Sequence, residues 1–224
     1  MGFRMKSLNQ QIIKFEYDQN FKDQDFYVSK SNEFSFLLLN SWPKWEKNFL
    51  NLIGEKFSGK SHLINIFLKK FGGIKINANE INDDFLKKMK TYENIIIEDL
   101  NENVDEKILF TLFNNIEQDN KYLIVSSTQS IVDFSFELND LNSRAKNFLL
   151  SQIDKPEDDL LYALILKNLS DRQILIDKKL IDFIIKRINR SYSKISEFIY
   201  KIDEISLKRK KSIDFKIIKE VLGE

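Results

Sequence analysis

The sequence predicts an α/β fold with a parallel five-stranded sheet, followed by a small all-helical part. Three observations predict this class. From Asn48 onward, short apolar runs alternate with amphipathic runs of helix length, which is typical of parallel strands joined by crossover helices. A glycine-rich motif, G-x-x-x-x-G-K-S, separates the first of these strands from the first of these helices. After Pro156 only helical periodicity remains.

The expected elements follow from this alternation. The strand candidates are Phe49–Ile53, Ile74–Asn77, Asn94–Glu98, Tyr122–Ser126 and Asn147–Gln152. The helical runs between them are Lys60–Phe71, Asn79–Lys90, Val104–Gln118 and a mixed stretch over Ser130–Arg144. The later helices are Glu157–Asn168, Lys178–Asn189, Ser193–Lys208 and Phe215–Leu222, with Asp177 and Asp214 as N-caps of two of them. We therefore expect an N-terminal arm over 1–24, an α/β subdomain over 25–154 and a helical lid over 155–224.

Composition narrows the classes of function. Lys and Arg number 35 and Asp and Glu number 34, so the formal charge of +1 provides no global field toward nucleic acid or an anionic membrane. The chain has no cysteine and one histidine, His62, which excludes disulfides and thiolate metal sites and disfavours a Ser-His triad. No apolar run reaches the ~18 to 20 residues of a membrane span, and the start lacks a signal peptide, so a cytoplasmic protein is expected.

The motif at Gly54–Ser61 reads GEKFSGKS and satisfies the pattern of a phosphate-binding loop. Gly54 and Gly59 permit the turns that wrap a phosphate, and Lys60 can reach the β and γ phosphates of a nucleotide. The Ser61 hydroxyl can ligate Mg²⁺ while the helix N-terminus faces the anion. A chance match is the alternative, but a strand before and a helix after are both expected here. The remaining candidate nucleotide contacts are Glu55, Lys56, Phe57, Ser58 and His62, the last with a packing role as its alternative.

The stretch Asn94–Leu100 reads NIIIEDL and is the candidate for the acidic strand that holds Mg²⁺ in such proteins. Glu98 takes the metal position, where Asp is usual, and Asp99 follows as the candidate catalytic carboxylate. A buried strand with a solvated acidic tip is the alternative interpretation. The longer side chain of Glu98 leaves both the magnesium geometry and hydrolysis open.

With these motifs in order, the chain resembles the DnaA family of AAA+ proteins, and most closely its stand-alone regulators of the Hda type. The resemblance rests on GKSHL at 59–63, IIIEDL at 95–100, LNDLNSRAKN at 138–147, QIDKPEDD at 152–159 and FIIKRINR at 183–190. It covers residues 25–222. It implies an AAA+ P-loop domain with a helical lid, adenine nucleotide (ADP or ATP) and Mg²⁺ as cofactors, and a role in replication initiation.

The resemblance also assigns individual residues. Arg144 corresponds to the arginine finger, which acts in trans on a nucleotide held by a neighbouring subunit; a surface arginine at a helix end is the alternative. Thr128 lies where sensor 1 is expected, although a polar residue at a strand end is also ordinary turn chemistry. At the sensor 2 position Ser193 stands where an arginine is expected, and Lys194 and Arg190 are the candidate substitutes.

Two further expectations concern the ends of the chain. DnaA continues into a helix-turn-helix domain, whereas this sequence ends at Glu224, so we expect no direct sequence-specific DNA binding. Hda-like proteins carry an N-terminal peptide for the sliding clamp, and Gln11, Ile12, Ile13 and Phe15 form a degenerate version of it. A plain N-terminal arm is the alternative.

The resulting hypothesis is an Hda-like regulator with weak or no ATPase of its own. It would bind adenine nucleotide, with ADP favoured, dock on the DNA sliding clamp and promote hydrolysis of DnaA-bound ATP through Arg144. The oligomeric state, including a homo-oligomer, stays open. The alternatives are an autonomous P-loop ATPase of the DnaA or helicase-loader type, which would hydrolyse ATP alone, and a nucleotide-independent scaffold, which would bind neither ADP nor ATP.

Overall fold

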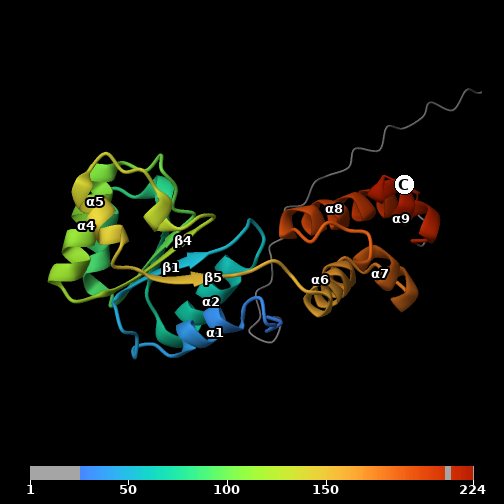
Figure 1. Cartoon of the computed structure of the whole chain (residues 1–224), viewed down its shortest axis with the longest axis horizontal. Helices are drawn as coiled ribbons and strands as arrows, with labels where there is room; N and C mark the ends of the chain where they lie inside the picture. Colours follow the sequence, from blue (N-terminus) through green and yellow to red (C-terminus); the bar gives the residue numbers. More distant parts are fainter. Residues whose placement is uncertain (1–25, 210–212, 224) are drawn as a thin grey trace, which may run out of the picture.

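The computed structural model describes residues 26–209 and 213–223 (Figure 1). The expected N-terminal arm and its candidate clamp peptide lie outside these residues. An α/β part occupies one end of the molecule and four helices occupy the other (Figure 1). The expected α/β class with a helical C-terminal part is therefore confirmed, while the expected division after residue 154 stays a prediction.

The sheet has five parallel strands in the order β2-β3-β4-β1-β5. Their bounds are β1 Phe49–Ile53, β2 Ile74–Asn77, β3 Asn94–Glu98, β4 Tyr122–Ser127 and β5 Leu149–Gln152. Because β4 lies between β1 and β3, the turns that follow β1 and β3 leave the same carboxyl edge on either side of β4. This order brings the two predicted motifs together.

Helices cover both faces of the sheet, so its strands are mostly apolar on both sides. The helices of this part are α1 Glu33–Asn40, α2 Lys60–Phe71, α3 Asp83–Lys88, α4 Glu106–Gln118 and α5 Asn139–Ala145. One face packs against α4 and α5, with Leu112 and Phe113 fully buried. The other packs against α1 and α2, where Ile64 and Phe67 are buried (Figure 1).

The lid has a core of its own. Its helices are α6 Asp158–Asp171, α7 Lys178–Ile185, α8 Tyr192–Arg209 and α9 Phe215–Leu222. The buried side chains of this core are chiefly Leu161, Ile165, Ile181, Ile184, Ile199 and Ile217. Asp177 and Asp214 cap α7 and α9 as expected, accepting hydrogen bonds from Lys179 N–H at 3.0 Å and Ile217 N–H at 2.9 Å. Within the described part of the chain, no helix has the length and apolar character needed to cross a bilayer.

Three segments differ from the expectation. Helix α1 was not expected, since its sequence EFSFLLLN has too many apolar residues for a clear helical period. The run expected over Asn79–Lys90 is broken because the Asn82 side chain caps a new helix, accepting from Phe85 N–H at 2.9 Å. The mixed stretch after Ser130 resolves into a 3₁₀ turn at Ile131–Asp133 and helix α5.

Asn51 is a fully buried polar residue in the middle of β1. Its amide nitrogen donates to Ser127 Oγ at 2.8 Å and to the Val125 carbonyl at 3.3 Å. Its amide oxygen accepts from Ile131 N–H at 2.8 Å. These bonds tie β1 to the end of β4 and to the loop after it, beside the candidate site.

Candidate functional site

The phosphate loop joins β1 to α2 at the carboxyl edge of the sheet, and its geometry requires both glycines. A Cβ at Gly54 would lie 2.5 Å from Ser58 Oγ, and Gly54 N–H donates to the Ser127 carbonyl at 3.1 Å. Gly59 has φ +97 and is the N-cap of α2, a left-handed conformation that disfavours any side chain. The sequence therefore folds here into the tight turn that a phosphate would need.

Lys60 is folded back onto this turn. Its Nζ donates to the Gly54 carbonyl at 2.7 Å and to the Glu55 carbonyl at 3.1 Å, and the residue is 6% exposed. Burial lowers the pKa of the Lys60 ammonium, although the charges of Asp99 and Glu55 oppose that shift. The two carbonyl oxygens are neutral acceptors, and a charged phosphate oxygen would form a stronger hydrogen bond with the Lys60 ammonium. The Lys60 side chain is therefore suited to leave these carbonyls when a phosphate binds.

The middle of the loop provides a second observation in favour of an anion. Ser58 Oγ is buried and has no hydrogen-bond partner among the described residues, and such a group is costly unless something satisfies it. Lys56 and Phe57 are exposed at the tip, where Phe57 has φ +67, an uncommon conformation for a bulky residue. The Ser58 hydroxyl and the Lys60 ammonium thus face inward, whereas Lys56 and Phe57 face solvent.

Glu98 ends β3 on the side of the sheet that packs against α2. Its Oε2 lies 3.0 Å from Lys75 Nζ of β2, and the same ammonium donates to Asn65 Oδ1 of α2 at 3.0 Å. The Glu98 side chain is 15% exposed, and its Oε1 is buried without a hydrogen-bond partner in the part of the chain that the structure describes. Nothing in the sequence around Lys75 marks it as a partner of Glu98. This ammonium supplies one positive charge to the carboxylate predicted to hold Mg²⁺.

The residues present fit a Mg²⁺ ion only in part. Glu98 Oε1 is open to a further donor or cation, and Ser61 is exposed at the start of α2. Among residues 26–209 and 213–223, however, no three His, Asp or Glu side chains gather as a metal site. A metal ion here would be held by Ser61, Glu98 and the phosphates of the nucleotide, as is usual for Mg²⁺ beside nucleotides.

The turn after β3 is fixed by the end of β4. Asp99 has φ +57, and its N–H donates to Ser126 Oγ at 3.1 Å, while Leu100 N–H donates to the Ser126 carbonyl at 2.8 Å. Thr128, the sensor 1 candidate, is exposed just beyond β4. Ser126 was not singled out in the sequence, because a serine near a strand end carries no distinctive signal.

The lid reaches the phosphate loop through Glu55. This carboxylate accepts hydrogen bonds from the Ser191 hydroxyl, from Tyr192 N–H at 3.2 Å and from Ser193 N–H at 3.2 Å. Burial pulls the pKa of Glu55 upward, but the bonds from Ser191, Ser193 and Tyr192 outweigh it and hold the pKa below its usual value. The loop side chain therefore caps the first turn of α8, at the position where sensor 2 was expected.

The two candidate substitutes for sensor 2 are engaged elsewhere. Lys194 Nζ pairs with Glu197 at 2.9 Å along α8, and Arg190 pairs with Asp158 of α6 at 2.6 Å. His62 is buried below the loop, with its ring edge-on to Phe26 at 5.2 Å between centroids. The functional roles given to Lys194, Arg190 and His62 stay predictions.

Arg144 lies away from this edge, on α5, where it packs against α4. Its guanidinium pairs with Glu117, donates to Asn114 Oδ1 at 2.6 Å and lies 5.6 Å from the centre of the Phe110 ring. The side chain is 21% exposed. The Arg144 side chain is thus oriented by α4 and lies apart from the phosphate loop of its own chain, and its role as an arginine finger in trans stays a prediction.

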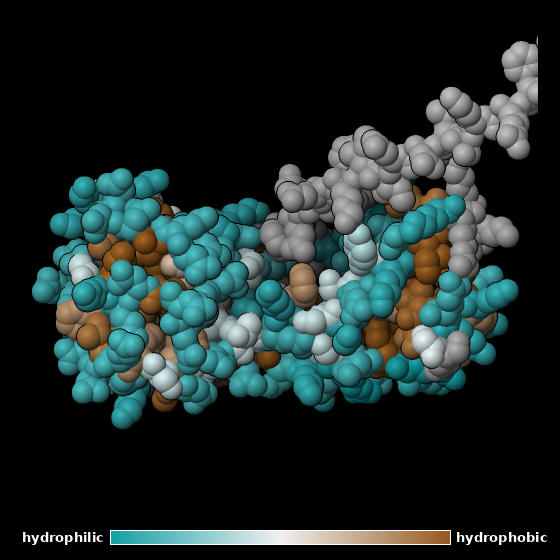
Figure 2. Space-filling view, turned by 90° about the horizontal axis from the view of Figure 1, so that it is seen from above, coloured by the Kyte–Doolittle hydropathy of each residue, from teal (hydrophilic) through white to brown (hydrophobic). Residues whose placement is uncertain are grey.

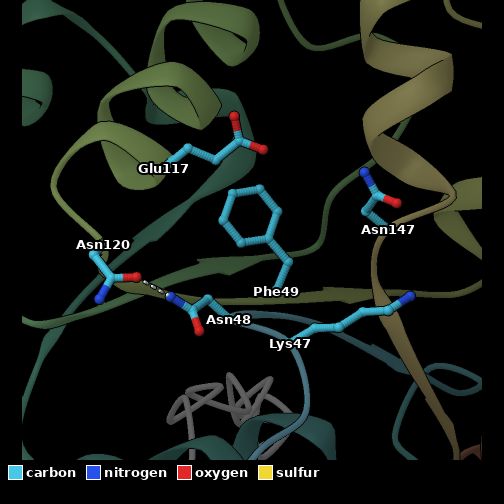
Figure 3. Close-up of a pocket in the computed structure, with 6 residues that line it drawn as sticks. All are labelled: Lys47, Asn48, Phe49, Glu117, Asn120 and Asn147. Carbon is cyan, nitrogen blue, oxygen red and sulfur yellow. Dashed lines mark hydrogen bonds between the residues drawn. The ribbon is translucent and has the colours of Figure 1, made fainter.

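A pocket beside Glu117 opens at the opposite, amino edge of the sheet (Figure 3). Phe49 points into it, and the Asn48 side chain donates to Asn120 Oδ1 at 2.9 Å (Figure 3). Lys47 and Asn147 complete the lining. Asn48, Asn120 and Asn147 precede β1, β4 and β5, whereas the phosphate loop follows β1, so this pocket is not the nucleotide site.

Sequence comparison finds replication initiators. No family model matches the chain. It is 22% identical over 246 residues to the chromosomal replication initiator protein DnaA of Buchnera aphidicola, covering 98% of this chain and 56% of that protein. It is 24% identical over 206 residues to an uncharacterised protein of Haemophilus influenzae, covering 84% and 89%. The chain spans about half the length of the DnaA relatives it matches.

Comparison of structures finds the same fold. Domain III of the replication initiation protein DnaA from Thermotoga maritima superposes with a TM-score of 0.73 at 16% identity, covering 92% of this chain and 97% of that one. DnaA from Aquifex aeolicus bound to AMPPCP gives 0.67 at 17% identity, covering 86% and 70%. The Thermotoga maritima RuvB Holliday junction motor gives 0.66 at 15% identity, covering 90% and 70%. Sequence and fold therefore both match the AAA+ domain of DnaA.

Proposed function

We propose that this chain is a cytoplasmic regulator of replication initiation of the Hda type, which binds adenine nucleotide and promotes hydrolysis of ATP held by DnaA. The observation that carries the proposal is a phosphate loop with an inward-facing Lys60, on a chain that matches the AAA+ domain of DnaA in sequence and fold. The fold supports a role related to replication initiation. The regulatory role, the clamp and the arginine finger belong to the proposal alone.

Nucleotide binding is supported by the polar atoms of the loop. The Lys60 ammonium donates to two carbonyl oxygens, and Ser58 Oγ is buried with no partner among residues 26–209 and 213–223, so a phosphate would satisfy both groups. One matched structure, DnaA of Aquifex aeolicus, is described as bound to AMPPCP. When bound, Mg²⁺ would neutralise phosphate charge beside Ser61 and Glu98. We propose ADP as the resident nucleotide, since Glu98 is already paired with Lys75.

Arg144 is the residue proposed to act on the partner. A guanidinium is permanently charged and planar, so it can stabilise charge that develops on a transferring phosphoryl group. Its contacts with Glu117 and Asn114 hold the side chain against α4 in the free protein. On docking with DnaA, the Arg144 guanidinium would leave the Glu117 carboxylate, which is 47% exposed, and bind the phosphates of the ATP held by DnaA.

The experiment combines the full chain with ATP-loaded DnaA, sliding clamp and DNA, and measures release of inorganic phosphate. We expect stimulated hydrolysis, lost in Arg144→Ala and partly kept in Arg144→Lys. Arg187→Ala is the matched control, because Arg187 follows α7 in the lid, where its guanidinium lies over the Phe183 ring of that helix. Absence of stimulation, or full stimulation by Arg144→Ala, would sink the proposal.

The clamp contact is proposed for Gln11, Ile12, Ile13 and Phe15, which lie outside the described residues. An extended peptide of this kind would place its apolar side chains in a preformed pocket and lose conformational freedom on docking. Surface plasmon resonance on immobilised clamp tests it directly. Binding that survives replacement of Ile13 and Phe15 by alanine would leave the N-terminal arm without this role.

An autonomous ATPase is the second candidate. The observation in its favour is Asp99, which directly follows β3 at the carboxyl edge of the sheet and donates its N–H to Ser126 Oγ of β4 at 3.1 Å. This candidate predicts hydrolysis by the chain alone, abolished by Lys60→Ala and by Asp99→Asn. Calorimetry with ADP and ATP also tests a third possibility, a scaffold that binds neither nucleotide.

A further inference from the structure

Lys75 brings an ammonium group to the end of β3 from outside both predicted motifs. It lies on β2, two residues before Asn77, which is in register with Glu98 of β3. Side chains two residues apart on a strand share a face, so Lys75 lies on the same face of the sheet as Glu98. Its Nζ is 3.0 Å from Glu98 Oε2 and donates to Asn65 Oδ1 at 3.0 Å. This one ammonium therefore joins β2, β3 and α2.

The bond to Asn65 holds the ammonium beside the residues expected to bind Mg²⁺, which are Ser61 and Glu98. Asn65 follows Ser61 on α2 by one helical turn. Side chains four residues apart on a helix are neighbours, with about 5 to 6 Å between their Cβ atoms. Lys75 is thus bonded to Glu98 itself and to the neighbour of Ser61. Its positive charge is held by the protein next to both.

The ion pair leaves Glu98 poorly suited to a second cation. Because the Glu98 side chain is only 15% exposed, loss of Lys75 would leave a largely buried, unpaired charge. Glu98 Oε1 has no hydrogen-bond partner within the described ranges, so it is the oxygen that a metal ion would use. An ion there would share the carboxylate with the ammonium on Oε2, and the like charges would repel each other. Lys75 therefore weakens metal binding at Glu98.

Charged groups, rather than apolar ones, distinguish the region where the α/β part meets the lid. Seen from above, the visible apolar side chains gather over the two ends of the molecule, whereas the surface between them is mostly teal or white (Figure 2). Burial lowers the pKa of Lys60, the charges of Asp99 and Glu55 raise it, and the charge of Lys56 lowers it. These two ammonium groups and two carboxylates leave no net charge around the phosphate loop.

We propose that Lys75 takes the electrostatic place of a divalent metal ion at this site, so that the chain binds nucleotide with little dependence on Mg²⁺. The inference rests on the proposed nucleotide binding, and it gives to β2 a charge that a bound ion supplies in other proteins with this loop. Since the charges around Lys60 balance, an unpaired Glu98 would make the site repel phosphate. Lys75 offsets that charge from within the protein.

The test measures ADP binding to the full chain by calorimetry, in EDTA and in Mg²⁺. The affinity of wild type is expected to differ by less than about threefold between the two buffers. In Lys75→Met the affinity in EDTA is expected to fall on the order of fivefold, because one positive charge beside the phosphates is lost, and Mg²⁺ is expected to restore it.

Lys70→Met is the matched control. Lys70 lies near the C-terminal end of α2, at the far end of that helix from the phosphate loop, and donates to Asn40 Oδ1 at 2.9 Å. The same change of side chain there removes a charge that solvent and salt screen from the phosphates. This variant is expected to bind ADP as wild type does in both buffers.

Two further variants separate the charge of Lys75 from its contribution to the fold. Lys75→Arg keeps a cation on β2 and is expected to keep ADP binding independent of Mg²⁺. Glu98→Gln removes the carboxylate but keeps the ammonium, so ADP binding in EDTA should be at least as tight as in wild type, and Mg²⁺ should add nothing. A merely structural Lys75 would lower stability in Lys75→Met without creating a response of ADP affinity to Mg²⁺.

The inference and the proposed function fail in different ways. If Mg²⁺ tightens ADP binding to wild type by more than about threefold, the inference is overturned while nucleotide binding stands. The inference is also overturned if ADP binding to Lys75→Met responds to Mg²⁺ no more than wild type does. If wild type binds ADP in neither buffer, the nucleotide part of the proposed function is wrong, and the role of Lys75 falls with it.

Discussion

Replacing Lys75 by methionine tests whether an ammonium neutralises the carboxylate at the proposed metal position. The Lys75 and Glu98 charges lie 3.0 Å apart, with side-chain exposures of 39% and 15%. At an effective dielectric constant of ~20 the gross attraction would be ~5 kcal/mol. Exposure of Lys75 and the desolvation of both ions reduce the net loss to about 1 to 2 kcal/mol. For a chain of this size, that lowers the midpoint of thermal unfolding by roughly 2 to 6 °C.

The assay is thermal unfolding in EDTA and in 10 mM Mg²⁺, without nucleotide. In Lys75→Met the freed Glu98 carboxylate should gain affinity for Mg²⁺, so the ion should restore part of the lost stability in the variant and do little for wild type. Lys87→Met is the control, because its ion pair with Asp84 has exposures of 77% and 92% and should be worth less than about 0.5 kcal/mol. Equal midpoints for Lys75→Met and wild type in EDTA, or equal stabilisation of both by Mg²⁺, would refute this reasoning.

Three further predictions follow from the site and its surroundings. Lys60→Ala should weaken ADP binding about 30- to 100-fold, the loss of one charged hydrogen bond, measured by calorimetry; a change below threefold would contradict it. The pKa of Glu55 is depressed, so its contribution to lid docking is present above its unfolded pKa of ~4.3 and is lost as pH falls through the folded value. Amide protection factors at Tyr192 should therefore hold from pH 7 to 5 and fall below pH 4, and a fall already at pH 6 would argue against Glu55. Gly73→Ala should destabilise the protein by about 2 to 4 kcal/mol, since its Cβ would lie 2.7 Å from the Asn94 carbonyl oxygen. Gly72→Ala places no atom within 4 Å of the new Cβ, but its φ +71 and ψ 176 lie where glycine is strongly preferred, so it should cost about 1 to 3 kcal/mol in urea unfolding, from backbone strain alone.

The strands of the sheet and helix α2 could be predicted because local sequence determines them. The bounds of β1, β2, β3 and α2 agree with the expectation, since each apolar run there ends at a polar residue or a glycine. Two elements were not predicted from local sequence. At Asn82 a side chain accepts a backbone hydrogen bond and begins a new helix inside the expected run. In α1 the run of apolar residues shows no helical period. Such segments carry no clear period, so only packing decides them.

The site was predictable as a set of motifs but not as a set of contacts. The spacing of Gly54, Gly59 and Lys60 identifies the loop, because the backbone geometry of the loop depends on those residues directly. The partners of Glu55 and Glu98 are different: they belong to α8 and β2, and nothing in the sequence near either acid indicates them. Both are long-range pairings that arise only after the elements have packed.

Asn51 bears on how this chain chooses one arrangement among several. The strands of the sheet are nearly continuous apolar runs, and sliding one of them by two residues would keep every side chain on its original face. Hydrophobic burial alone distinguishes such alignments poorly. In the observed alignment the buried amide of Asn51 meets Ser127, Val125 and Ile131, and a slide would leave its hydrogen bonds unmade at a cost of ~1 to 3 kcal/mol. One asparagine thereby fixes which residue of β1 faces which residue of β4, and with it the depth at which the phosphate loop begins.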